Sequence, residues 1–185
     1  MSDVDFKFIF IPPLLNTHPT DTFRPGTIGA LLDIYEQAVL ELKKAIECIA
    51  DEKLEVIIDP PTADENCRSL QSILSHVIHA GYGYAISIHN LQGDHLKRPD
   101  KRYHTTIHQY IQELADMFVF TEKIFQQLAD QVLAKPDPLL TINAGWGKQY
   151  DMEQMTEHAI VHILRHKRQV EKMKVQMLNT TRTLE

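Results

Sequence analysis

The chain has 185 residues, of which 43% are hydrophobic and 24% charged, and its formal net charge is -6. This length and composition are typical of one soluble globular domain that is large enough to bury a core. The excess of acidic residues argues against a general binder of nucleic-acid backbones, and no stretch reaches the roughly 18 apolar residues of a membrane helix.

Residues 1–27 are rich in proline and threonine and show no helical period, so we expect an extended N-terminal arm. From Ile28 onward, apolar residues recur at spacings of three and four. This pattern predicts an amphipathic helix that ends at about residue 50. A linker closed by Pro60 and Pro61 follows.

A second helix is expected to begin between residues 62 and 69 and to end near residue 91, because the next segment carries Gly93 and Pro99. A third helix is predicted from about residue 106 to residue 133, where apolar side chains again keep the helical period. No alternating strand pattern of useful length competes with these helices.

Prolines and glycines interrupt the helical pattern over residues 134–150. The fourth predicted helix begins at Asp151, whose carboxylate can accept from first-turn amides while Gln154 reaches back to the cap. It ends near residue 178, and residues 179–185 form a frayed C-terminal tail. Four amphipathic helices are buried most simply as a bundle, so we predict an all-α fold with a four-helix bundle at residues 28–178.

The two cysteines, Cys48 and Cys67, are too few for a disulfide framework and suggest a reducing compartment. The start "MSDVDFKFIFIPPLL" places acidic residues before a short apolar run and lacks the basic beginning of a signal peptide. We therefore expect a cytoplasmic protein without a membrane partner.

Three histidines stand at a spacing of four in "EHAIVHILRHKRQ". At about 100° per residue, His166 lies in the middle of the apolar stripe of the fourth helix, His162 about 40° away, and His158 at the margin. Two imidazoles one turn apart therefore face the core, where burial without partners is costly. A metal ion solves this problem, because neutral imidazole is a good ligand for Zn, Ni, Cu or Fe.

The second helix offers a third ligand. His76 lies at the edge of its apolar stripe, and His79 lies about 60° further out, at the surface or beside the site. The small residues that follow His76 on its own face leave a space, which we take as the candidate opening to the metal; they are Ala80, Gly83 and Ser87. If His76, His162 and His166 bind one ion, their reactive nitrogens should lie within about 3 to 4 Å of one another.

The remaining patterns carry less information. His89, His95, His104 and His108 are expected to be ordinary surface residues. "HILRH" is not the H-E-x-x-H of zinc proteases, because Ile163 stands where the glutamate is needed. Di-iron E-x-x-H pairs, P-loops, G-x-S-x-G elbows and dinucleotide fingerprints are absent from the sequence.

The segments "CRSLQSILSHVIHAGYGYAI" and "YDMEQMTEHAIVHILRHKRQV" together resemble the DinB/YfiT-like superfamily of metal-dependent enzymes, in a bacterial branch. The resemblance extends from "RPGTIGALLDIYEQAVLEL" to the end of the fourth helix. It implies a DinB-like up-down-down-up four-helix bundle and a metal held by His76, His162 and His166. The family often ends its motif with His-Arg-Gly-Gln, where this chain has His-Lys-Arg-Gln over residues 166–169.

The resemblance implies an enzyme in which a divalent ion, Zn or Ni by preference, activates water or a thiol for hydrolysis or S-transfer on a small molecule. The thiol itself is expected to be of low molecular weight. Neither Glu157 nor Tyr84 is placed by the sequence as a base. Replacing His79 or His158 is expected to matter much less than replacing His162.

Two other interpretations stay open. The chain could be a non-catalytic metal-binding or stress-associated bundle, or a bundle whose core histidines bond to one another or to backbone. Members of the family commonly pair, so we expect a homodimer, with Phe118 and Phe120 on different faces of the third helix as sequence support. Trp146 is either a lid or wall of the site or a cap on the end of the bundle.

Overall fold

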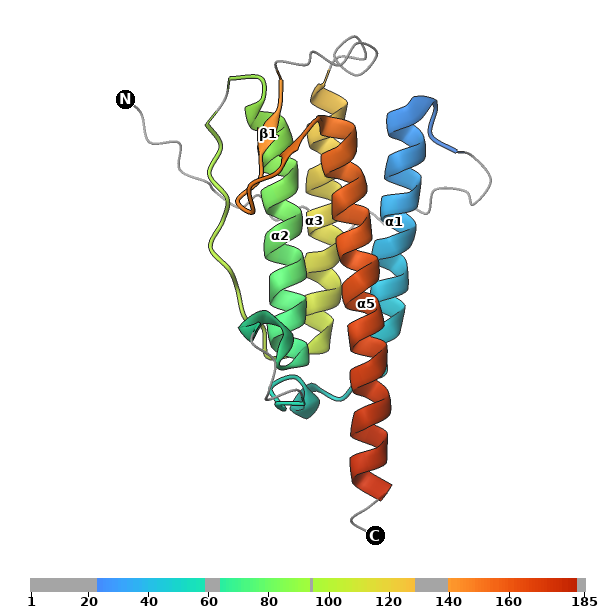
Figure 1. Ribbon diagram of the computed structural model, residues 1–185. Coiled ribbons are helices and arrows are strands. Elements are labelled where there is room, and N and C mark those ends of the chain that lie inside the picture. Colours follow the sequence, from blue (N-terminus) through green and yellow to red (C-terminus); the bar gives the residue numbers. More distant parts are fainter. Residues whose placement is uncertain (1–22, 59–63, 94, 129–139, 183–185) are drawn as a thin grey trace.

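A computed structural model describes residues 23–58, 64–93, 95–128 and 140–182 (Figure 1), with side chains described to residue 178. Within these residues the long elements are α1 (Gly26–Ile46), α2 (Leu70–Asn90), α3 (Ile107–Gln127) and α5 (Met152–Arg182). Short 3-10 helices cover Asp51–Lys53 and Glu65–Cys67. The all-α prediction is confirmed, and no described helix has the length and apolar character needed to cross a bilayer.

Each helix packs against two others: α1 against α3 and α5, and α2 against α3 and α5. Figure 1 shows α1 and α5 running in one direction and α2 and α3 in the other. The connection between α2 and α3 returns along the bundle. At its start the Asn90 side chain bonds to both backbone groups of Leu96, and at its end Gln71 of the first turn of α2 donates to the carbonyl of His104.

The helix bounds differ from the predicted ones at three ends. The first helix ends at Ile46 rather than near residue 50, and α5 continues to Arg182, into the predicted tail. The third helix ends at Gln127, because Leu128 has an extended backbone with ψ 119°. The prediction that this helix continues to residue 133 is therefore wrong at residue 128. Most of the predicted N-terminal arm, residues 1–22, lies outside the described residues.

Side chains fix the starts of three helices. The predicted cap at Asp151 is confirmed: its carboxylate accepts from the Gln154 amide at 2.8 Å, and the Gln154 side chain accepts from the Asp151 amide at 3.1 Å. Ser69 forms a reciprocal capping box with Ser72, and Thr106 caps α3. Such caps satisfy amides that have no partner inside the helix.

A small hairpin precedes α5 and was not predicted. Strands β1 (Ile142–Asn143) and β2 (Gln149–Tyr150) pair in antiparallel register. The turn between them holds Trp146 and is closed by Gly147, whose φ of +79° is a conformation that glycine adopts without strain. Two-residue strands are too short for an alternating pattern to reveal them.

Close packing explains one of the two glycines inside α2. A Cβ on Gly81 would lie 2.0 Å from the sulfur of Met117 in α3. Met117 is fully buried, so the two helices could not approach this closely with a larger residue at position 81.

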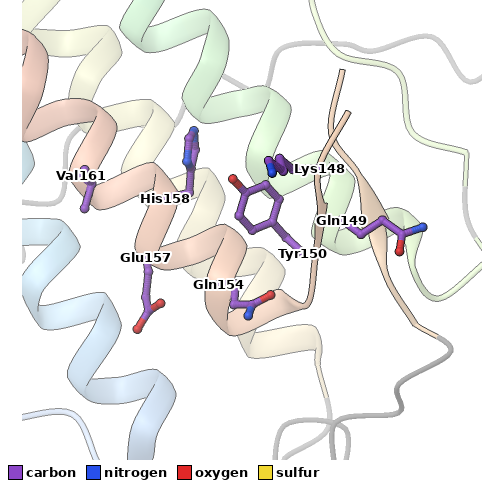
Figure 2. A pocket seen from close by; sticks show the side chains of 7 residues that line it. All are labelled: Lys148, Gln149, Tyr150, Gln154, Glu157, His158 and Val161. Carbon is purple, nitrogen blue, oxygen red and sulfur yellow. The ribbon is translucent and has the colours of Figure 1, made fainter. Parts of the chain in front are cut away.

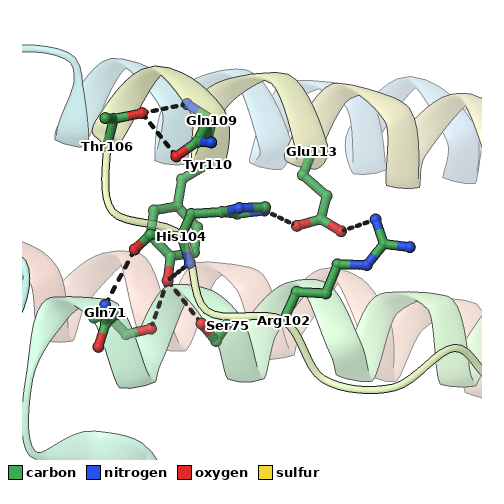
Figure 3. Close-up of polar contacts among 8 residues, drawn as sticks. All are labelled: Gln71, Ser75, Arg102, His104, Thr106, Gln109, Tyr110 and Glu113. Atoms are coloured by element: carbon green, nitrogen blue, oxygen red, sulfur yellow. Dashed lines mark hydrogen bonds and ion pairs between the residues drawn. The ribbon is translucent and has the colours of Figure 1, made fainter. Parts of the chain in front are cut away.

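A buried tyrosine ties the returning segment to both α2 and α3 (Figure 3). The Tyr110 hydroxyl lies 2.7 Å from the Ser75 hydroxyl, accepts from the His104 amide at 3.1 Å and donates to the Gln71 carbonyl at 3.3 Å. His104 also bonds to Glu113 of α3 through its ring. These contacts hold α3 parallel to α2.

We expect Tyr110→Phe to lower the free energy of unfolding by about 1–3 kcal/mol, because it leaves buried polar partners unsatisfied while keeping the ring. Urea denaturation of both proteins measures the difference. Tyr103→Phe is the matched control, since Tyr103 is 58% exposed, and it should change stability little. Equal losses for the two variants would contradict the role assigned to the Tyr110 hydroxyl.

Candidate metal centre

The structure brings His76, His162 and His166 together at the seam between α2 and α5. The Nε2 atoms of His76 and His162 are 3.0 Å apart, and those of His162 and His166 are 3.1 Å apart. The ligand atoms of the three rings all lie within 4.8 Å of one another. The predicted convergence of these three imidazoles is therefore observed, while metal binding itself stays a prediction.

Helix geometry accounts for the position of each ring. His162 and His166 are one turn apart and share one face of α5, and α2 packs against that face. His166 is only 3% exposed, as its place in the middle of the apolar stripe predicts, whereas His76 and His162 are half-buried. The site thus has a closed inner side at His166 and a more accessible outer side.

Burial keeps the three rings neutral. Burial, and after it the neighbouring His166 and His76, lower the pKa of His162 to about 3. Burial and then His166 lower the pKa of His76 to about 4. The pKa of His166 is also lowered, chiefly by burial, although Gln169 opposes the shift. At neutral pH all three nitrogens are in the form that binds metals.

The arrangement of the nitrogens fits a cation better than it fits hydrogen bonding. A neutral imidazole carries one N–H, and each bare nitrogen has one lone pair. If all three rings carry their proton on Nδ1, the three Nε2 lone pairs face one another without a donor. If the neighbouring rings carry it on Nε2, the one lone pair on Nε2 of His162 has to accept from both of them. Nδ1 of His162 is buried without a hydrogen-bond partner. A divalent ion bound by all three Nε2 atoms removes this conflict.

An aromatic cluster adjoins the outer side of the site. The His158 ring stacks on Trp146 with centroids 4.9 Å apart, and it contacts Tyr84 at 5.3 Å and Tyr150 at 5.6 Å. Tyr84 also meets His162 edge-on at 5.7 Å. Trp146 is 50% exposed, so it forms a wall beside the histidines rather than a buried cap. Tyr150 was missed by sequence reasoning because only the unpredicted hairpin brings it here.

A shallow depression of about 350 Å³ opens at this wall (Figure 2). Figure 2 shows Tyr150 beside His158, while the Glu157 side chain points away from them. Glu157 is exposed and therefore does not face the three histidines. The full lining is Lys148, Gln149, Tyr150, Gln154, Glu157, His158 and Val161.

Polar groups surround the inner side of the site. Gln169 lies beside His166, and its side-chain oxygen accepts from the Cys67 thiol at 3.8 Å. The thiol is also within 3.5 Å of an Asp64 oxygen, whose negative charge raises the pKa of His166. Arg165 has the opposite effect and lowers the pKa of both His162 and His166. Asp64 and Arg165 therefore act on the pKa of His166 with opposite sign, and Lys101 also lowers the pKa of His76.

The predicted opening over the small residues of α2 is filled at its central residue, Gly83. A Cβ on Gly83 would lie 2.8 Å from the guanidinium of Arg98, so this side chain of the returning segment covers the space. Ala80 is buried, and the Ser87 hydroxyl donates to the Gly83 carbonyl at 2.8 Å. Sequence reasoning could not detect Arg98, because its position depends on the path of the connection.

The other histidines lie apart from the three Nε2 atoms. His79 is half-buried, and burial, followed by Arg98 and Lys101, lowers its pKa. His95 and His108 are exposed, as predicted. His104 is not an ordinary surface residue: its side chain is 19% exposed and bonds to Glu113.

Comparison with protein families, with curated proteins and with solved structures finds no match to this chain. The case for a function therefore rests on the residues and their geometry.

The lowered pKa values predict how the metal-free protein responds to acid. In the unfolded chain both His76 and His162 titrate near 6.5, whereas in the folded chain they titrate near 4 and 3. Between these values the unfolded chain binds more protons, so the free energy of unfolding falls as the pH drops from about 6.5 toward 4. Denaturation of metal-free protein at about pH 7, 6 and 5 measures the slope.

His162→Gln should reduce this slope, because the substituted side chain does not titrate. His95→Gln, at an exposed position, is the control and should leave the slope unchanged. A wild-type slope no steeper than that of His162→Gln would contradict the assignment.

Proposed function

We propose that this protein is a divalent-metal-dependent enzyme of the DinB/YfiT-like type, acting on a small molecule by hydrolysis or S-transfer. The observation that carries the proposal is the meeting of the Nε2 atoms of His76, His162 and His166, all neutral at pH 7. The shared direction of α2 and α3 is in keeping with the up-down-down-up bundle that the sequence resemblance implies.

Three imidazole ligands suit Zn or Ni and leave coordination positions for other molecules. An ion held in this way lowers the pKa of a coordinated water or thiol toward neutrality. The thiol substrate in the S-transfer version is a compound of low molecular weight. The chain contributes the neutral donor set and the aromatic wall that limits access from one side.

His158 is the side chain best placed to accept a proton beside this site. Its ring lies 6.3 Å from that of His162, and burial lowers its pKa, so it is an unprotonated base at pH 7. Tyr84 contacts both rings, but burial raises its pKa to about 12 and it stays a neutral donor. Glu157 points away. His158 therefore has a larger role in this proposal than its margin position in the sequence suggested.

A non-catalytic metal-binding bundle is the second candidate, and one observation favours it. Arg98 covers Gly83, so the opening expected over the small residues of α2 is filled at that position. The two candidates differ in whether a small molecule can approach the metal from the depression at His158.

A homodimer and a cytoplasmic location complete the proposal. The aromatic residues cited for the dimer do not support it, because Phe118 is buried against Tyr35 and Phe120 packs edge-on against Tyr82. The expectation of a dimer therefore rests on the sequence resemblance alone. Light scattering over a wide concentration range should give twice the chain mass; a constant mass of 21.3 kDa would refute it.

Protein purified without a His tag or nickel should contain about one divalent ion per chain, measured by elemental mass spectrometry. His162→Ala should lose the ion and, with it, both thiol conjugation to a generic electrophile and ester hydrolysis, while circular dichroism shows a folded bundle. His79→Ala should keep the metal. Equal rates for wild type and His162→Ala in both assays would end the case for metal-dependent catalysis on those substrates.

His158→Gln tests the proton acceptor separately from the metal. We expect the variant to keep the ion. The rate of thiol conjugation or ester hydrolysis, whichever the wild type catalyses, should fall by about 10²-fold, which is typical for loss of a general base. Its pH–rate profile should lose the acidic limb. His108→Gln, at an exposed position on α3, should behave like wild type.

A further inference from the structure

A second depression runs along the exposed face of α5, next to the candidate metal centre. It has a volume of about 350 Å³ and is lined by Val161, Leu164, Arg165, Arg168, Gln169 and Lys172. Val161 also lines the depression at His158, so the two hollows are neighbours on one face of the helix. All six lining residues come from α5, and Gln169 is the residue that lies beside His166.

The cations of this groove differ from the other cations nearby. Lys167 pairs with Glu41 and Glu171, and Lys174 donates to the carbonyl of Ala45. In the part of the chain that the structure describes, no such ion pair or hydrogen bond is found for Arg165, Arg168 or Lys172. Although the chain has a net charge of -6, this groove thus carries three positive charges without an ion-pair partner among the described residues.

The spacing of the three cations sets their relation to the metal centre. Residues 165, 168 and 172 are separated by three and four positions and so share one side of the helix. Arg165 follows His162 by three residues, which places it one turn along from a proposed ligand.

We propose that this groove binds the anionic group of the substrate, a carboxylate or a phosphate, through Arg165, Arg168 and Lys172. Guanidinium groups bind such oxygens with two parallel hydrogen bonds, and the apolar Val161 and Leu164 exclude part of the water that would weaken the attraction. The anion at Arg165 leaves the rest of a small molecule one helical turn from His162. The substrate class in this inference rests on the proposed function, whereas anion binding by the groove does not.

The test is binding of two probes, inorganic phosphate and succinate, to the full chain by NMR titration, with and without Zn. Wild-type protein should bind at least one probe, with shift changes at Val161, Leu164 and residues 168–172. Arg165→Gln/Arg168→Gln should weaken that binding by about tenfold or more, since each charge-assisted hydrogen bond is worth more than a neutral one. Comparison of the two probes distinguishes phosphate from carboxylate recognition.

Lys44→Gln/Lys123→Gln is the matched control, because it removes two positive charges from exposed positions on α1 and α3. It should bind the probes as wild type does. No saturable binding by wild type, or equal weakening in the two double variants, would overturn the proposal. Zn content is measured in the same samples: a wild-type protein that holds Zn but binds neither probe overturns the groove alone, and a wild-type protein that binds a probe but holds no Zn overturns the proposed function alone.

Discussion

The seam between α2 and α5 must bury three imidazoles whose Nε2 atoms lie about 3 Å from their neighbours, and the rest of the site follows from this constraint. Charged rings at this distance would repel one another, and burial already disfavours the charged form. The rings are therefore neutral, and the one lone pair on Nε2 of His162 cannot accept a hydrogen bond from both of its neighbours. The same packing that stabilises the bundle thus creates a set of donors that a divalent cation satisfies.

Access to these donors is controlled by parts of the chain outside the helices. The returning segment places Arg98 over Gly83, and the hairpin places Trp146 against His158. The outer side of the site therefore lies along α5, between the aromatic wall at one end and the cations that begin at Arg165 at the other. A substrate that meets both would combine a flat or apolar part with an anionic part.

Helical periodicity predicted the features that are set within a single helix. It located the four helices, the cap at Asp151 and the inward faces of His162 and His166, because these follow from residues a turn apart. It failed where distant segments meet: Arg98 over Gly83, Glu113 on His104, and the hairpin that brings Tyr150 to the site. The end of α3 was also misplaced, since apolar spacing continues past the residue at which the backbone turns away.

The position of α5 between α1 and α2 has a consequence for the order in which the site is assembled. His76 and His162 are 86 residues apart in sequence, so the site joins two helices that are distant along the chain. Closing a longer loop costs more entropy than closing a shorter one, so we expect the docking of α5 on α2 to come late in folding. An ion held by all three rings would cross-link α5 to α2, and the nascent chain could acquire it only after His166 has left the ribosome.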